Sequence, residues 1–477
     1  MINNSLWLKG TKTKASKKVT KDIETDILII GGGITGLSTA YFLKDKKVTL
    51  IDKGKIGYGK TAFSTGKLTY LQDSLLKGSK EKENLYISSQ IEAIEIVKNI
   101  IIENGIKCNY ESNSSFLYAT NNKEKRKLLK IEKILKRCNI PYKVKDNNNL
   151  YNPIYSIKVD DTAVINPAKY ILGLKEVLNN KIDIYENSFA HDFDYKDNRF
   201  IVHVNDNYIT AKILVVATHY PFLVSLGLVP FKTYIEKSYL VATKTDKNKK
   251  FNAITQGGDY SIRYYSDPEE YMIFCSCSNK LSKNMDNEKI VKNISWEVKS
   301  RYNSKVKYIW SNTDVMSPDL IPLSGPLDKN IYIATGYSTW GLTNGTLSAK
   351  VISDHILNVE NKYTKLLDPN RMSNKVNIIL NNFQNAKSFI ISKIVKNYSF
   401  YRDNVEVYTE NGIRYGKYID ENNEEHIVYN KCPHMKCNLI FNSVSKTWDC
   451  PCHSSRFDID GNIICGPANY SIKVEKK

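Results

Sequence analysis

The chain has 477 residues, a formal net charge of +19 and a hydrophobic content of 42%. This length exceeds what one hydrophobic core usually serves, and it predicts two or three domains. No run approaches the roughly 18 consecutive apolar residues of a transmembrane helix, and the N-terminus shows no apolar signal segment. We therefore expect a cytoplasmic protein without a transmembrane segment. The lysines are scattered and no nucleic-acid motif accompanies them, which favours a compositional habit over a nucleic-acid partner; a face that steers an acidic redox partner is the alternative.

The first predicted unit is a strand, a glycine-rich turn, a helix and a second strand. Residues 25–30 form a short apolar run that leads into a G-x-G-x-x-G sequence with the glycines Gly31, Gly33 and Gly36. In such a turn the first glycine permits the tight bend, the second lets the backbone approach a pyrophosphate, and the third allows close helix packing. Asp52 ends the second strand, where a carboxylate can accept hydrogen bonds from a ribose. The pattern predicts a nucleotide site, but it does not choose between FAD and NAD.

Three later segments resemble the D-amino-acid oxidase/glycine oxidase superfamily. Residues 57–72 resemble the segment that passes the flavin, residues 185–222 resemble the β-meander and the strand that returns to the FAD, and residues 331–356 resemble the strand, glycine loop and helix at the flavin edge. The resemblance implies FAD as a cofactor. That last helix would direct its N–H groups at the flavin pyrimidine and stabilise negative charge on the reduced ring. Further cofactor contacts are implied at Ala190, Ala217, Gly341, Leu342, Thr343, Asn344 and Gly345.

The same resemblance covers residues 24–358 and implies two parts within them. The first is an α/β FAD-binding Rossmann-like domain, and the second is an α+β substrate domain with an antiparallel sheet. Only one dinucleotide fingerprint is visible, so the electrons are expected to come from a small-molecule substrate rather than from NAD(P)H. The family usually takes a hydride from a carbon next to nitrogen, which implies an amine or an amino acid. The FAD-binding part is expected over 24–75, 151–222 and 321–358, and the substrate part over 76–150 and 223–320.

Two side chains are candidates for catalysis or substrate binding. Arg263 lies on a probable strand and could hold a carboxylate through two hydrogen bonds, with a surface or inter-domain role as the alternative. Lys67 follows the flavin-passing segment and could bond near the flavin N5 through water, with a phosphate or surface contact as the alternative. Trp340 could cap the pocket or belong to the core. His219 sits on a turn beside the nucleotide strand, where a structural role is favoured over a catalytic one.

The last 46 residues contain five of the nine cysteines. Cys432 and His434 form a C-x-H box, and after fifteen residues Cys450 and His453 form a C-x-x-H box. Two cysteines and two histidines at this spacing match the Rieske domain, in which the cysteines hold one iron of a [2Fe–2S] cluster and the histidines hold the other. A zinc site usually opens with two cysteines two to four residues apart, so the C-x-H box favours the cluster.

The Rieske resemblance extends over residues 400–477 and implies a small all-β domain. Cys437 and Cys452 occupy the positions of the extra cysteine pair of the quinol-oxidising subtype, which implies a disulfide between the two cluster loops. Lys436 replaces a glycine that is common at its loop position. Cys465 is extra and is expected to be an unliganded thiol.

Residues 359–399 join the two modules and are expected to form a helical linker. Apolar residues recur there at helical spacing beside several lysines, which favours packing against the flavin module, with peripheral membrane contact as the alternative. As a whole, the chain resembles bacterial FAD-dependent oxidoreductases with a C-terminal Rieske domain. The resemblance implies an FAD-dependent dehydrogenase for an amine or amino acid, with electrons passing from flavin to the [2Fe–2S] cluster and on to a protein or quinone acceptor. A non-catalytic electron-transfer or redox-sensing protein is the alternative. A Rieske oxygenase is disfavoured because the remaining histidines show no convincing pairing for a mononuclear iron.

Overall fold

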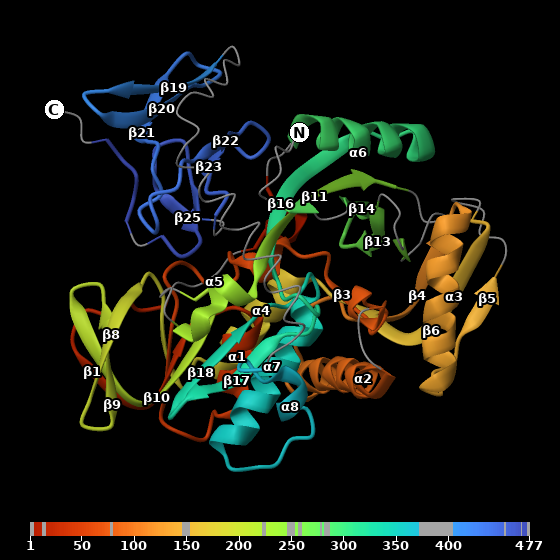
Figure 1. Ribbon diagram of the computed structural model, residues 1–477, viewed down its shortest axis with the longest axis horizontal. Helices are drawn as coiled ribbons and strands as arrows, with labels where there is room; N and C mark the ends of the chain where they lie inside the picture. The colour runs from red at the N-terminus through yellow and green to blue at the C-terminus, as the bar shows by residue number, and fades with distance from the viewer. Residues whose placement is uncertain are drawn as a thin grey trace.

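Two large sheets and two small ones organise the chain in the computed structural model (Figure 1). None of the helices among the described residues is long and apolar enough to span a membrane. Of the helical linker predicted over 359–399, residues 359–371 are described and contain the short helix α8 (Thr364–Leu367), and residues 372–399 lie outside the described residues. The structure describes residues 4–11, 16–76, 80–145, 153–221, 226–245, 253–255, 260–276, 279–280, 287–371, 404–452, 455–468 and 470–474.

The first sheet has a parallel core in the order β18-β10-β1-β2-β7, with β17 antiparallel at one edge and β8 and β9 forming a meander with β10. Successive side chains of β1 point to opposite faces. Ile27 and Ile29 therefore pack with helices α1 and α7, whereas Leu28 and Ile30 pack with the meander. Both faces are covered, which explains the continuous apolar run in the sequence. The elements are β1 (Ile23–Ile30), α1 (Ile34–Phe42), β2 (Val48–Ile51), α4 (Pro167–Leu178), β7 (Asp183–Tyr185), β8 (Ala190–Lys196), β9 (Arg199–Val204), β10 (Asn207–His219), β17 (Leu323–Asp328), β18 (Ile331–Thr335), α7 (Gly341–Ile356) and α8 (Thr364–Leu367).

The second sheet has the order β15-β11-β14-β13-β12-β4-β6-β3, with β16 on β11 and β5 on β6. Its described pairs are antiparallel as predicted except one, in which β12 pairs with β4 in parallel. Such a pairing needs a long crossover, and the chain makes it by returning through the first sheet between these two strands. The elements are β3 (Lys67–Leu68), α2 (Lys80–Glu103), β4 (Glu111–Ala119), α3 (Asn122–Arg137), β5 (Lys143–Lys145), β6 (Tyr155–Val164), α5 (Val229–Lys232), β11 (Tyr234–Lys244), β12 (Ala253–Thr255), β13 (Tyr260–Ser266), β14 (Glu270–Ser276), β15 (Asn279–Lys280), α6 (Asn287–Tyr302) and β16 (Val306–Met316), with short 3-10 turns η1 (Leu6–Leu8), η2 (Lys60–Phe63), η3 (Asp73–Leu76) and η4 (Leu226–Leu228).

The C-terminal region forms two small antiparallel sheets around the fully buried Trp448. This domain rests on β11 of the second sheet through buried polar contacts. Lys237 Nζ lies 2.5 Å from Asp449 Oδ2, and Asn442 Nδ2 donates to Tyr239 Oη at 3.0 Å. The strands are β19 (Val405–Glu410), β20 (Ile413–Ile419), β21 (Glu425–Tyr429), β22 (Ile440–Asn442), β23 (Thr447–Asp449), β24 (Arg456–Phe457) and β25 (Ile463–Cys465).

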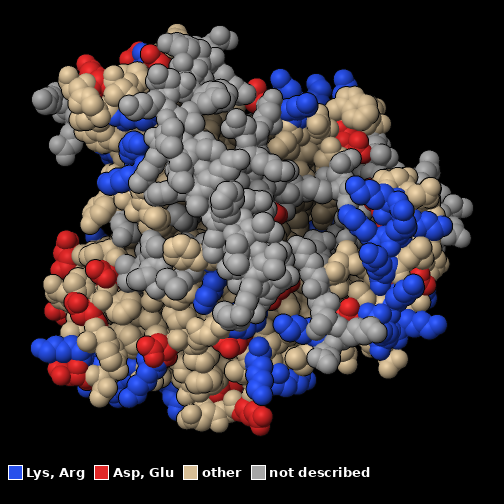
Figure 2. All heavy atoms as spheres, in the orientation of Figure 1, with Lys and Arg blue, Asp and Glu red and all other residues tan. Residues whose placement is uncertain are grey.

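Part of the positive charge is concentrated over α3, where Figure 2 shows Lys and Arg side chains gathered. The two acids of this helix are used internally. Glu124 accepts a hydrogen bond from the Thr120 amide, and Glu132 accepts one from the Tyr155 hydroxyl. The positive charge is therefore partly clustered on α3, whereas the sequence favoured scattered lysines. The exposed cations of the helix are Lys123, Arg126, Lys130, Lys133, Lys136 and Arg137.

Candidate functional site

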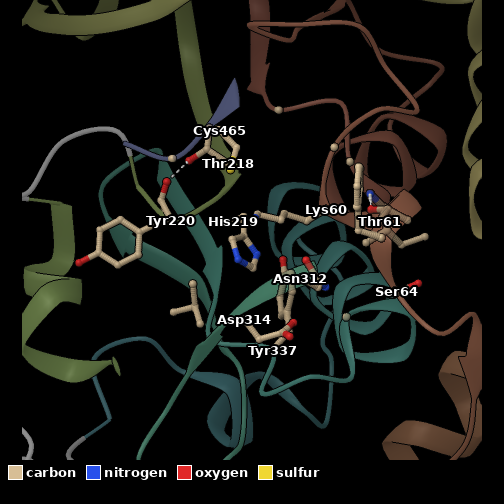
Figure 3. Close-up of a pocket in the computed structure, with 18 of the residues that line it drawn as sticks. Lys60, Thr61, Ser64, Thr218, His219, Tyr220, Asn312, Asp314, Tyr337 and Cys465 are labelled. Carbon is tan, nitrogen blue, oxygen red and sulfur yellow. Dashed lines mark hydrogen bonds between the residues drawn. The ribbon is translucent and has the colours of Figure 1, made fainter. Parts of the chain in front are cut away.

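A cavity of about 840 Å³ lies at the carboxyl ends of the parallel strands (Figure 3). The turn after β1, the ends of β2 and β10, and the start of α7 form one side of it. Strands β11 and β16 of the second sheet form another side. Open α/β sheets bind their ligands at this edge, and the volume suits a cofactor together with a small molecule.

The glycine-rich turn lies at the cavity as predicted. Gly31 has a φ of 111°, and a Cβ on it would lie 2.4 Å from the carbonyl oxygen of Ala217. Gly33 precedes α1 and lines the cavity, and a Cβ there would come no closer than 3.6 Å to any neighbour. Gly36 is not among the lining residues; it lets α1 approach the strand, because its Cβ would lie 1.8 Å from the Gly31 oxygen. The turn thus leaves a cradle that a single Cβ at position 33 would begin to fill, which fits a pyrophosphate.

Asp52 lies in the cavity at the end of β2, and Ala190 also lines it. The two Asp52 oxygens accept hydrogen bonds from the Gly32 amide at 2.7 Å and the Gly54 amide at 2.8 Å. Burial raises the pKa of this carboxyl above its ordinary value, against the lowering effect of the two amides. A carboxylate has about four acceptor positions, so Asp52 keeps capacity for ribose hydroxyls.

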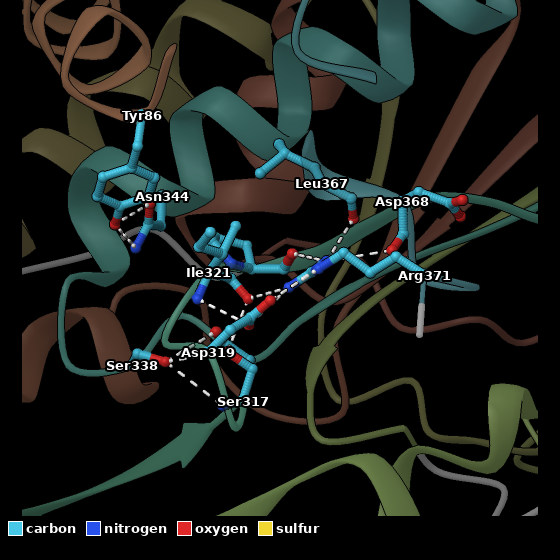
Figure 4. Close-up of polar contacts among 11 residues, drawn as sticks. Tyr86, Ser317, Asp319, Ile321, Ser338, Asn344, Leu367, Asp368 and Arg371 are labelled. Atoms are coloured by element: carbon cyan, nitrogen blue, oxygen red, sulfur yellow. Dashed lines mark hydrogen bonds and ion pairs between the residues drawn. The ribbon is translucent and has the colours of Figure 1, made fainter. Parts of the chain in front are cut away.

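The start of α7 reaches the cavity through Trp340, Gly341 and Leu342. Thr343, Asn344 and Gly345 follow on the helix and are not among the lining residues, because each residue turns the helix by about 100°. The Gln72 amide donates to the Thr343 hydroxyl at 3.0 Å, and Asn344 lies among α2 side chains, Tyr86 included (Figure 4). These polar residues lock α7 to the rest of the module, and a contact between their side chains and the flavin edge stays a prediction.

Arg371 fixes the loop that joins β16 to β17 (Figure 4). Its guanidinium pairs with Asp319 at 3.0 Å and donates to the carbonyl oxygens of Ile321 and Pro322 at 2.6 Å each. The same side chain also binds the Leu367 carbonyl at the end of α8. Arg371 therefore anchors the described part of the linker to the loop that follows β16.

Lys67 and Arg263 are both buried but are not among the lining residues. Lys67 donates to the Ser261 hydroxyl at 2.8 Å, and Ser261 itself lines the cavity; burial lowers the pKa of Lys67 to about 7. Arg263 Nη1 donates to the carbonyl oxygens of Thr65 and Ile165, at 2.7 Å each. Arg263 therefore braces the turn before β3. A substrate contact for Lys67 or Arg263 remains a prediction.

His219 lines the cavity at the end of β10. Its Nε2 lies 3.0 Å from the Thr313 carbonyl, so Nε2 carries the proton and donates. Burial, followed by the nearby Lys60, lowers the pKa of His219 to about 3. The imidazole is neutral at physiological pH and ties β10 to β16, in line with the structural role favoured from the sequence.

Lys60 on η2 and three residues of β16 also line the cavity and were not predicted: Ser311, Asn312 and Asp314. Lys60 Nζ contacts the Thr313 hydroxyl. Burial raises the pKa of Asp314 to about 6. A lone acid in an otherwise buried strand was the only local sign, and it gains meaning only once β16 is seen to border the cavity.

Three buried polar atoms of the lining have no hydrogen-bond partner among the described residues: Trp340 Nε1, Ser311 Oγ and Asn312 Oδ1. Buried polar groups in folded proteins are nearly always satisfied. Together with the cradle at Gly33 and the helix N-terminus at Gly341, these atoms fit a cavity whose remaining partners come from a bound cofactor and substrate.

The predicted cluster ligands Cys432 and Cys450 are buried and adjacent, with a hydrogen bond between their thiols. His434 follows on the first loop, and burial lowers its pKa to about 4, which leaves a neutral imidazole able to bind metal. His453 lies outside the described residues. Lys436 has a φ of 58°, a conformation that glycine would adopt more easily. The described donors, two thiols and one imidazole on adjoining loops, suit a [2Fe–2S] cluster.

The predicted disulfide between Cys437 and Cys452 is confirmed; it ties the two cluster loops across 15 residues of chain. A cross-link that closes a loop of this length contributes about 3 kcal/mol to stability. We expect the Cys437→Ser/Cys452→Ser double variant to lose about that much stability. Guanidinium unfolding followed by tryptophan fluorescence would measure it. Cys465→Ser, which removes a thiol outside the disulfide, is the control, and equal unfolding midpoints for the two variants would contradict the prediction.

One loop separates the cavity from the cluster ligands. Gly466 and Pro467 line the cavity, and Lys53, next to Asp52, donates to the Gly466 carbonyl at 3.0 Å. On its other side the loop packs on Ser455: a Cβ on Gly466 would lie 2.3 Å from the Ser455 Cα. The Ser455 carbonyl in turn accepts a hydrogen bond from the Cys450 amide at 2.7 Å. The two candidate cofactor sites are therefore neighbours.

A nucleotide cradle beside a cysteine–histidine cluster site defines a flavin and iron–sulfur oxidoreductase. The FAD dependent oxidoreductase family matches residues 26–355, and the Rieske [2Fe-2S] domain matches residues 396–475. The chain belongs to the FAD dependent oxidoreductase family and carries a C-terminal Rieske domain. The predicted fold class and the two cofactors, FAD and a [2Fe–2S] cluster, are confirmed.

Similar proteins share this organisation in whole or in part. YhfW of Bacillus subtilis, which bears the name of a Rieske 2Fe-2S iron-sulfur protein, is 28% identical over 98% of this chain and 96% of its own. Gamma-glutamylputrescine oxidoreductase of Escherichia coli is 21% identical over 70% of this chain and 84% of its own. The structure of glycine oxidase from Geobacillus kaustophilus matches 74% of this chain and all of its own with a TM-score of 0.65 at 15% identity, which shows a common fold.

Proposed function

We propose that this protein is a dehydrogenase that oxidises an amine or amino acid with FAD and passes the electrons through the Rieske cluster to an external acceptor, a protein or a quinone. The observation that carries the proposal is the Gly466–Pro467 loop, which borders both the flavin cavity and the cluster loops. Cofactors held at these two sites would have this loop between them and would be well placed to exchange electrons. The substrate class is supported by the likeness to gamma-glutamylputrescine oxidoreductase and glycine oxidase.

The residues of the chain have distinct tasks in this reaction. The N-terminus of α7 at Gly341 would stabilise negative charge on the flavin ring, because helix N-terminal amides attract anions. FAD, when bound, supplies the acceptor for a pair of electrons. Strands β11 and β16 would hold the substrate against the FAD, and the Gly466–Pro467 loop covers the cavity from the other side. A one-electron carrier on the same chain favours a dehydrogenase over an oxidase. The cytoplasmic location of the protein remains a prediction.

An anaerobic stopped-flow experiment on the full-length holoprotein tests the relay. A panel of amines and amino acids is mixed with the protein, flavin bleaching is followed by absorbance, and the cluster is followed by EPR after freeze-quenching. We expect one substrate to reduce both centres, the flavin first. A flavin that bleaches while a dithionite-reducible cluster stays oxidised would overturn the relay. A flavin that no amine or amino acid bleaches would favour the non-catalytic carrier.

Replacing the ligand Cys450 by serine separates the two halves of the reaction. Because the thiolate is lost from the cluster while the flavin cavity does not include this side chain, we expect substrate still to bleach the flavin, with the Rieske EPR signal absent. Reoxidation by a one-electron acceptor should slow by at least about tenfold. Cys465→Ser is the matched control and should keep the EPR signal; an unchanged reoxidation rate in Cys450→Ser would place electron exit at the flavin itself.

A further inference from the structure

Asp314 and Asn312 present an acidic and an amide side chain to the flavin cavity from one strand. Both lie on β16, two residues apart, so their side chains point to the same side of the sheet. Both line the cavity, and Figure 3 shows them beside His219. Neither belongs to the nucleotide cradle of β1, β2 and α7. They therefore border the part of the cavity that faces the second sheet, where the substrate is expected.

The acceptor atoms of these two residues make no hydrogen bond within the described part of the chain. The Asn312 side chain is only 8% exposed, and its Oδ1 makes no hydrogen bond. The Asp314 carboxylate makes no hydrogen bond or ion pair with a described residue. Lys60, a cation of the lining, attracts the Asp314 carboxylate electrostatically, but it gives its hydrogen bond to the Thr313 hydroxyl.

Such an arrangement selects the charge of its ligand. An ionised carboxylate withdrawn from water is costly unless a cation or hydrogen-bond donors accompany it. A ligand carboxylate would add a second negative charge beside Asp314. Arg263, the residue expected to bind a carboxylate, already donates hydrogen bonds from Nη1 to two main-chain carbonyl oxygens. A donor-rich cation satisfies both acceptors at once: an ammonium group has three N–H donors and no acceptor.

We infer that Asp314 and Asn312 bind the ammonium group of the substrate, which makes the substrate a cationic amine rather than an amino acid held by its carboxylate. The inference rests on the proposed function and narrows its substrate class. Asp314 forms the ion pair, and Asn312 Oδ1 accepts a second N–H. Because the two lie on a strand braced by His219, the ammonium group is held at a fixed position relative to the nucleotide cradle.

The test is a binding titration of the full-length, FAD-loaded protein under anaerobic conditions. The probes are straight-chain primary amines of two to six carbons, 1,4-diaminobutane, and D- and L-norvaline, which are n-butylamine with an added carboxylate. The change in the visible spectrum of the bound flavin reports the Kd. We expect n-butylamine to bind more tightly than either norvaline, and Asp314→Asn to weaken amine binding by about 10- to 100-fold, as for a lost hydrogen-bonded charge. Asp314→Glu should recover most of the affinity.

Glu236 supplies the matched control variant. Glu236 lies directly opposite Asp314 on the neighbouring strand β11, but it is not a lining residue. Glu236→Gln removes the same charge nearby, and we expect it to change the Kd less than about threefold. Equal losses in Asp314→Asn and Glu236→Gln, tighter binding of norvaline, or no binding by any amine would overturn the inference. If amines bleach the flavin and Asp314→Asn binds them normally, the inference fails and the proposed function stands. If amines bind through Asp314 without reducing either centre, the proposed function fails and the inference stands.

Discussion

Replacing Lys237 by methionine is expected to loosen the Rieske domain from the flavin module. The Lys237 side chain is 2% exposed, and its ammonium group lies 2.5 Å from the Asp449 carboxylate of the other domain. Arg456 donates to the second Asp449 oxygen at 3.1 Å. Although burial acts to raise it, the pKa of Asp449 lies below its usual range because of these two cations. Removing one partner of a buried ion pair costs about 3–5 kcal/mol, since the remaining charge stays out of water.

The consequence for function follows from the position of this pair. Asp449 directly precedes Cys450, the predicted cluster ligand, and Arg456 lines the flavin cavity. If the Rieske domain detaches from β11, the cluster moves away from the flavin. We expect Lys237→Met to slow reduction of the cluster by at least about tenfold in the stopped-flow experiment, with flavin bleaching by substrate much less affected, and to lower the denaturant concentration at which the two domains separate.

Lys244→Met is the control for this prediction. Lys244 lies on the same strand, but its side chain is 56% exposed and its partner Glu269 is shared with other lysines. Exposed ion pairs contribute about 0–1 kcal/mol, so this variant should behave like the parent protein. If Lys237→Met reduces its cluster at the parent rate, the buried pair does not hold the domain in its electron-accepting position.

The predictable parts of the site are those that a short stretch of sequence determines. A buried strand, a glycine turn and a helix that follow one another fix the cradle at Gly31 and Gly33, because each part has its own signal within a few residues. The two cluster boxes are similarly local. Asp314 and Asn312 were not predictable, because their meaning comes from the pairing of β16 with β11 and from the placement of both strands beside another sheet. The contact between Lys237 and Asp449 joins residues 212 positions apart, and neither residue is unusual in its own segment.

The rotation of α7 about its axis could not be predicted, for the same reason. The helix at Gly341 was correctly placed, but the sequence could not say which of its first residues face the cavity. That depends on how α7 is rotated, and the rotation is set by partners elsewhere in the chain. Gln72 holds Thr343, and Gly345 fits against Ile34 of α1, 2.7 Å from the position of its missing Cβ.

Two alanine substitutions in the glycine turn should separate folding from cofactor binding. In Gly36→Ala the new Cβ would lie 1.8 Å from the main-chain oxygen of Gly31, so α1 must move away from β1. Overpacking in a close-packed core costs about 1–3 kcal/mol, and a clash with main chain belongs at or above the top of that range. We expect a protein that unfolds at markedly lower denaturant concentration and is isolated largely without FAD.

Gly33→Ala should give the opposite pattern. Its φ of −81° suits alanine, and its Cβ would come no closer than 3.6 Å to the Thr61 hydroxyl, so the flavin-free protein should be as stable as the parent. The same methyl group would project into the space where the main chain approaches a pyrophosphate. We therefore expect FAD affinity to fall by at least about tenfold, measured by quenching of flavin fluorescence on titration into flavin-free protein. A Gly33→Ala variant that binds FAD normally would show that the pyrophosphate lies elsewhere, whatever the stability of Gly36→Ala.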